Sequence, residues 1–133
     1  TGVQTCALPI SGHQTLDLLR SHAGETSAWA LGIAVVLLSP LVEEIVWRGA
    51  VQQALKALGF PRLAAIATTA SLFALIHWSA VPPDARRSAL PALALLGVTL
   101  GWLMERCGRI AAPWAAHAAF NLANLLLFSM LPG

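Results

Sequence analysis

Long apolar stretches separated by short polar breaks form the main pattern of this chain. We place four such stretches at residues 28–58, 63–81, 88–104 and 110–131. Turn signals lie between the first three, Gly59-Phe60-Pro61 and Pro82-Pro83-Asp84. A membrane-spanning helix needs about 20 predominantly apolar residues. The pattern therefore predicts four membrane helices.

The first stretch carries charge within it. Only the 15 uncharged residues 28–42 precede Glu43, so a spanning helix must hold Glu43 and Glu44 within or near the hydrocarbon. A continuous helix over 28–58 would be about 46 Å long, more than the bilayer core. Pro40 removes one backbone hydrogen bond and predicts a kink just before the two glutamates.

Composition supports a membrane protein. The 133 residues are 57% hydrophobic and 11% charged, against about 25% charged in ordinary soluble domains. The net charge of +2, without any basic run, gives no indication of nucleic-acid binding. Cys6 and Cys107 are too far apart for a metal-ligand spacing. We therefore predict an all-α, polytopic transmembrane helix bundle in a lipid bilayer.

The chain divides into two parts. Residues 1–27 form an N-terminal segment, of which 1–11 resemble translated sequencing-adapter read-through and the rest is polar or interfacial. We expect residues 1–11 to be foreign and the protein to be truncated at this end. Residues 28–133 form the expected membrane core.

Three motifs place polar groups in the apolar stretches. They hold Glu43, Glu44, Arg48, His77, His117 and Asn121. Ionisable groups in hydrocarbon are costly and usually mark a functional site. Residues four apart share a helix face, so Glu44 can pair with Arg48 while Glu43 points about 100° away. By the same spacing, the ring of Phe73 can pack against the imidazole of His77. His117 and Asn121 also share a face and can donate hydrogen bonds to an oxyanion.

Each motif taken alone has an ordinary explanation. The glutamates and Arg48 could be a snorkelling cluster at a helix end. His77 could be a hydrogen-bonded packing residue, and His117 with Asn121 could be polar contacts between helices. Three such motifs on separate stretches favour one shared site, which requires the helices that carry them to converge.

Glu-Glu-x-x-x-Arg, Phe-x-x-x-His and His-x-x-x-Asn, in this order, resemble the CPBP family over residues 28–131. This is the CAAX-prenyl-protease and bacteriocin-processing family of intramembrane endopeptidases, also called Abi. The resemblance implies hydrolysis of a peptide bond in a membrane-associated protein or peptide. It implies that Glu43 activates water with the help of His77, and that His117 and Asn121 bind the oxyanion. Glu44 and Arg48 would match supporting residues.

The resemblance leaves a choice of mechanism, because the family was once described as metal-dependent. The chain has no His-Glu-x-x-His motif, although Glu43, His77 and His117 could in principle bind zinc. We expect a metal-free mechanism without a cofactor. The alanine-rich sequence favours a bacterial cytoplasmic membrane.

Two other classes of function stay open. The chain could be a non-catalytic membrane protein that binds a peptide in immunity or scaffolding. It could also be a small proton-coupled transporter module using Glu43, His77 and His117. Transporters commonly show internal repeats, and none is visible in the sequence.

Overall fold

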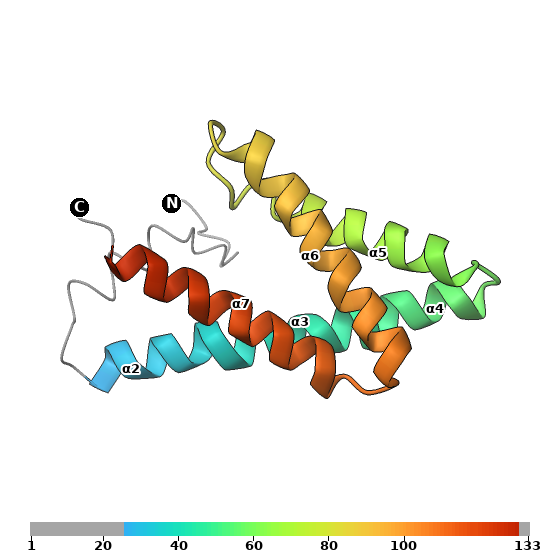
Figure 1. Ribbon diagram of the computed structural model, residues 1–133, viewed down its shortest axis with the longest axis horizontal. Coiled ribbons are helices and arrows are strands. Elements are labelled where there is room, and N and C mark those ends of the chain that lie inside the picture. The colour runs from blue at the N-terminus through green and yellow to red at the C-terminus, as the bar shows by residue number, and fades with distance from the viewer. Residues whose placement is uncertain (1–25, 131–133) are drawn as a thin grey trace, which may run out of the picture.

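A computed structural model of the chain describes residues 26–130 (Figure 1). Within this range every regular element is a helix, so the all-α prediction is confirmed for the part of the chain that the structure describes. The expected N-terminal segment lies almost entirely outside the described residues.

One continuous helical run forms the first half of the structure. It consists of α2 (Thr26–Ile33), the π-helical η1 (Ala34–Leu38), α3 (Ser39–Glu44), the π-helical η2 (Ile45–Val51) and α4 (Gln52–Ala57). Three further helices follow, α5 (Arg62–Ile76), α6 (Arg86–Cys107) and α7 (Ala111–Met130).

Pro40 lies at the start of α3, directly after a π-helical stretch. We predicted a kink there, and the structure has a change of hydrogen-bond pattern at this point. The backbone N–H of Ser39 bonds to the carbonyl of Ala34, five residues back, and that of Gln52 bonds to Trp47 in the same way. π-Helical insertions are frequent at functional sites, and here they flank the pair Glu43 and Glu44 on both sides.

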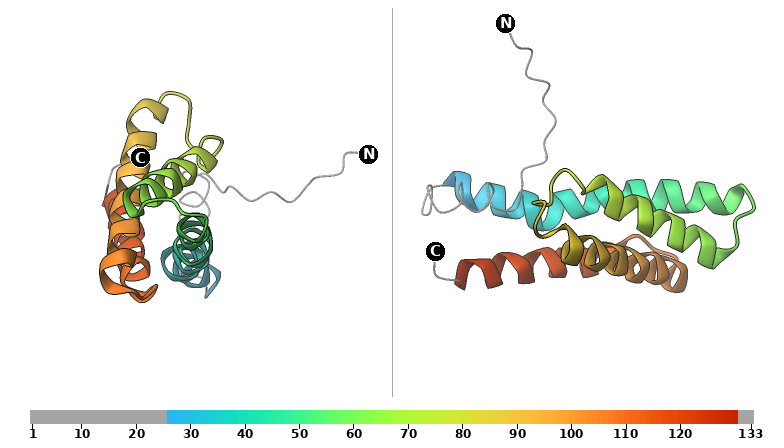
Figure 2. Two further views of the ribbon diagram at one scale, coloured as in Figure 1. Left: turned by 90° about the vertical axis from the view of Figure 1, so that its right-hand side faces the viewer. Right: turned by 90° about the horizontal axis from the view of Figure 1, so that it is seen from above.

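The other helices cover different halves of this long run. In Figure 1, α7 lies along its first half, and α5 returns over its second half. The helix α6 packs mainly on α5 and also on α7 (Figure 2). The middle of the run, where the glutamates are, is thus the region where α5, α6 and α7 all approach it.

The first turn falls where the sequence indicated, and the second begins earlier than it indicated. Gly59 has a φ of +92°, which suits glycine, and it connects α4 to α5. The second helix is shorter than the predicted stretch 63–81, because it ends at Ile76 and residues 77–80 form a turn. His77 therefore caps the helix end instead of lying within the helix.

Two of the four predicted spans meet the requirements of length and apolar composition among residues 26–130. They are Trp29–Ala57 and Arg86–Cys107. The helix α5 is apolar but has only 15 residues, fewer than the ~20 needed to cross the hydrocarbon.

Many large apolar side chains face outward, whereas one charged pair lies inside. Trp29, Leu58 and Leu63 are each at least 75% exposed, whereas Glu44 and Arg48 are fully buried. A water-soluble domain has the opposite distribution. The polar interior is therefore the part of the molecule to search for chemistry.

Candidate active site

A stripe of buried polar residues runs along one face of the long helical run. Glu44, Arg48 and Gln52 are four apart and each is 0% exposed. Arg48 donates from Nη1 to Oε1 of Glu44 over 3.0 Å. The pairing predicted from their spacing is confirmed.

The stripe is held against α6 through two glycine carbonyls. Arg48 donates from Nη2 to the carbonyl of Gly97 (3.1 Å), and Gln52 donates from Nε2 to that of Gly101 (3.2 Å). A Cβ at Gly101 would lie 2.9 Å from Oε1 of Gln52, and a Cβ at Gly97 would lie 3.0 Å from the Cα of Ala70 on α5, so both glycines sit at close contacts of α6. Small residues four apart on one helix face allow such close approach of neighbouring helices.

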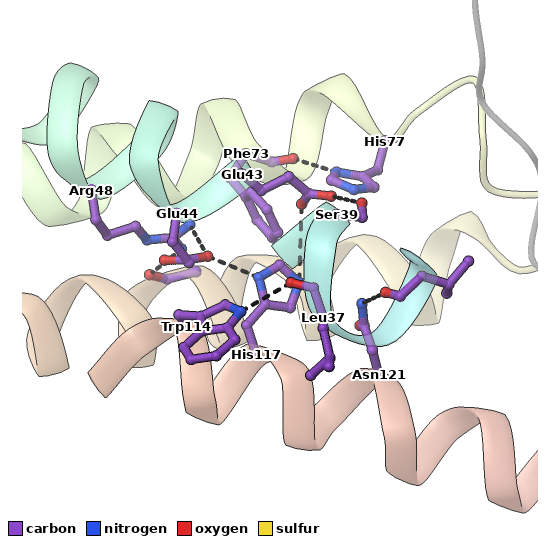
Figure 3. Close-up of polar contacts among 12 residues, drawn as sticks. Leu37, Ser39, Glu43, Glu44, Arg48, Phe73, His77, Trp114, His117 and Asn121 are labelled. Atoms are coloured by element: carbon purple, nitrogen blue, oxygen red, sulfur yellow. Dashed lines mark hydrogen bonds and ion pairs between the residues drawn. The ribbon is translucent and has the colours of Figure 1, made fainter. Parts of the chain in front are cut away.

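His117 lies between the two glutamates (Figure 3). Its Nδ1 is 2.8 Å from Oε1 of Glu44, and its Nε2 is 4.0 Å from Oε2 of Glu43. An ionised carboxylate only accepts hydrogen bonds, so Nδ1–H of His117 donates to Glu44. The Nε2 atom is thereby directed at Glu43.

Glu43 has one bonded and one unbonded carboxylate oxygen. Oε1 accepts a hydrogen bond from the Ser39 hydroxyl over 2.9 Å. Oε2 is buried and has no hydrogen-bond partner among the described residues. Its 4.0 Å separation from Nε2 of His117 is too long for a direct hydrogen bond. One water about 2.8 Å from each atom would join them at an angle of about 90°.

The ring of Phe73 joins the three motifs. Its centroid is 4.8 Å from that of His77 and 5.8 Å from that of His117, and the Arg48 guanidinium lies 4.9 Å from it. Phe73 is fully buried. The motif-bearing helices therefore converge, and Phe73 walls His77 as its spacing predicted.

The imidazole of His77 is fixed by its own helix. Its Nδ1 lies 2.7 Å from the carbonyl oxygen of Phe73. A carbonyl only accepts, so Nδ1 carries the proton, and in the neutral ring Nε2 holds the lone pair.

Asn121 bonds to the long helical run. It donates from Nδ2 to the carbonyl of Val35 over 3.1 Å, and Trp114 donates from Nε1 to that of Leu37 over 3.0 Å. The residues Trp114, His117 and Asn121 form one stripe on α7 that faces this run (Figure 3). The oxyanion role of Asn121 stays a prediction.

Comparison with known proteins gives the family. A family model described as type II CAAX prenyl endopeptidase Rce1-like matches residues 25–123. The chain belongs to this family. The matched range includes all three motifs, from Glu43 to Asn121, and it confirms the resemblance found in the sequence. No curated protein and no solved structure matches the chain significantly.

This Rce1-like chain has three polar residues near the site that sequence reasoning missed. They are Ser39, Gln52 and Trp114. Ser39 comes four residues before Glu43, and Gln52 comes four after Arg48. Trp114 comes three before His117. The spacing that pairs Glu44 with Arg48 would have found the first two.

Among residues 26–130 no three His, Cys, Asp or Glu side chains gather in a group that could hold a metal ion.

Proposed function

We propose that this Rce1-like chain is an intramembrane endopeptidase that hydrolyses a peptide bond by means of water activated by Glu43. The substrate is a membrane-associated protein or peptide. The observation that carries the proposal is the position of His117 between Glu44 and Glu43. Opposite its Nε2 lies a buried carboxylate oxygen without a hydrogen-bond partner among the described residues, at a distance that one water can bridge.

Glu43 is the general base of the proposed reaction. A water bound by its Oε2 transfers a proton to this oxygen as the water oxygen attacks the scissile carbonyl carbon. The C–N bond of the tetrahedral intermediate then breaks, and Glu43 returns the proton to the leaving amine. His77 assists by orienting the water, since its Nε2 lone pair can accept a hydrogen bond.

His117 and Asn121 are the proposed oxyanion donors. The Nδ1–H of His117 is engaged with Glu44. This leaves Nε2 as the ring atom that can donate to a developing oxyanion when it carries a hydrogen. An amide nitrogen has two hydrogens, so Asn121 retains one N–H after bonding to Val35. Arg48 holds Glu44 in place for His117.

The site is proposed to lie within a membrane, with α5 and α7 completing a four-helix membrane core. At 1.5 Å per residue, α5 is about 22 Å long and would reach only part of the way across the hydrocarbon. The buried pair of Glu44 and Arg48 and the outward-facing apolar side chains support this arrangement. We propose the bacterial cytoplasmic membrane as its location, on the basis of the alanine-rich sequence.

Cleavage of a membrane-tethered peptide tests the proposal. The full chain in lipid vesicles is incubated with peptides carrying a prenylated C-terminus, and products are identified by mass spectrometry. The wild-type chain and the loop variant Asp84→Asn are expected to cleave, and Glu43→Ala is not. Equal cleavage by Glu43→Ala would remove Glu43 from the mechanism.

A chelator separates the glutamate mechanism from a metal-dependent one. A general-base glutamate needs no metal, so cleavage is expected to continue after chelation. Loss of cleavage on chelation, with recovery when zinc is added, would assign the reaction to a metal centre.

A further inference from the structure

The carbonyl of Val35 accepts neither the backbone hydrogen bond of an α-helix nor that of a π-helix. In an α-helix it would accept from the N–H of Ser39, but that N–H bonds to Ala34 instead. In a π-helix it would accept from residue 40, which is proline and has no N–H. Pro40 is fully buried in the structure. A carbonyl without a partner is costly where water is excluded, and a side chain can supply the missing donor.

Asn121 supplies that donor from α7. Its Nδ2 lies 3.1 Å from the Val35 carbonyl, across 86 residues of sequence. On the same face of α7, His117 is one turn earlier and bonds to Glu44. The bond to Val35 therefore fixes the rotation of the Asn121 amide next to the cluster formed by His117 and the glutamates.

We infer that Pro40 is a positioning residue for the reaction, acting through the Val35 carbonyl on Asn121. By withholding a backbone N–H, Pro40 leaves the carbonyl free to hold one amide hydrogen of Asn121, and the other hydrogen is directed to the reacting carbonyl. This inference rests on the proposed function. It assigns to the proline before the glutamates a role in orienting an amide on a distant helix.

Pro40→Ala tests the inference because it restores the missing N–H. The new N–H competes with Asn121 for Val35, so the amide loses its fixed orientation. We expect kcat to fall about 10-fold, in the range produced by small misplacements of a reacting group. KM should stay within about twofold, since the amide acts only on the oxyanion. The melting temperature should not fall, because alanine favours the helix. Pro40→Ser also restores the N–H and replaces Pro40→Ala if that variant does not fold.

A double-mutant cycle distinguishes positioning from a general effect on the fold. Asn121→Ala should lower kcat about 100-fold, as does the loss of one oxyanion donor. The double variant should be no slower than Asn121→Ala alone, since Pro40 acts through this residue. Additive losses, or an unchanged kcat in Pro40→Ala, would overturn the inference.

Thermal unfolding tests the hydrogen bond from Asn121 to the Val35 carbonyl, here called the anchor, and needs no measurement of cleavage. Asn121→Ala should lower the melting temperature by about 4 °C in the wild-type chain, because one hydrogen bond is lost. It should have no such effect in the Pro40→Ala background. An equal decrease in both backgrounds would overturn the anchor even if cleavage is never observed. If the anchor is present but the wild-type chain does not cleave, the proposed function fails and the anchor stands.

Two controls match these variants. Pro91→Ala replaces the exposed proline within α6, and Asn124→Ala removes an amide that donates to the carbonyl of Phe120 on its own helix. Neither residue is near the glutamates in sequence or bonded to the site. Both variants are expected to leave kcat unchanged and to leave the effect of Asn121→Ala intact.

Discussion

Two carboxylate clusters lie along the same helical run, and they differ in how far their oxygens are satisfied. At the α4 end, Glu105 accepts from Gln52 and Lys56 on Oε1 and from Lys56 on Oε2, and its Oε2 forms an ion pair with Arg62. At the α3 end, Glu43 and Glu44 each have one bonded oxygen and one buried oxygen without a partner among the described residues.

The two clusters are therefore suited to different roles. A carboxylate surrounded by donors holds helices in place but has no oxygen left to accept a proton. The Glu105 cluster is also partly open to solvent, since Lys56 and Arg62 are 35% and 69% exposed. Glu43 keeps an unpaired buried oxygen 4.0 Å from the imidazole of His117, and this free oxygen fits the proposed general base.

The largest expected difference between the clusters is in activity. Glu43→Gln should lower the cleavage rate by about 10²–10⁴-fold, since Gln cannot accept the proton from water. The melting temperature should hardly change, because Gln retains the shape of the side chain. The matched variant Glu105→Gln should keep its kcat. Cleavage rates of both variants are measured on the same tethered peptide. A similar loss of rate in both would show that the two clusters do not differ in their role.

The second largest effect is expected on the free energy of unfolding. Arg48→Ala removes a partner from fully buried Glu44, which typically costs about 3–5 kcal/mol. Denaturant unfolding in detergent, together with expression level, measures this loss. An unchanged unfolding free energy would show that the pair does not support the fold.

Disturbing the close approach of α6 to α5 should have a smaller effect on the free energy of unfolding. Gly97→Ala would place a Cβ 3.0 Å from the backbone of Ala70 and should destabilise the chain by about 1–3 kcal/mol. Gly32→Ala meets nothing within 4 Å and should be neutral or stabilising by up to about 1 kcal/mol. Equal unfolding free energies for the two variants would contradict the close packing of α6 on Ala70 of α5.

Removing a cation from the Glu105 cluster should have the smallest effect. Lys56→Met breaks a half-exposed ion pair, and such pairs contribute about 0.2–1 kcal/mol. The rate of cleavage should stay the same. A decrease in kcat comparable to that of Glu43→Gln would mean that the distant cluster takes part in the reaction.

Much of this arrangement could be predicted from sequence. The four-residue spacing of Glu44 and Arg48 gave their pairing, and that of Phe73 and His77 gave the wall of the site, because these contacts are local to one helix. The apolar stretches gave the positions of the helices. The extent of the second one was wrong, since no charge or proline marks its end at Ile76.

Contacts between helices and backbone carbonyls could not be predicted. The bond from Asn121 to Val35 depends on a π-helical stretch whose hydrogen-bond pattern has no side-chain signature. The bond from Arg48 to Gly97 joins residues 49 positions apart and depends on the register between two helices. Side-chain spacing identifies which residues share a face but not which backbone group they meet.

The position of one water tests the central claim most directly. A high-resolution structure of the full chain in lipid should contain an ordered water within about 3.2 Å of both Oε2 of Glu43 and Nε2 of His117. The water should be lost in the Glu43→Ala variant. A direct hydrogen bond between Glu43 and His117, with no water held between them, would contradict the account.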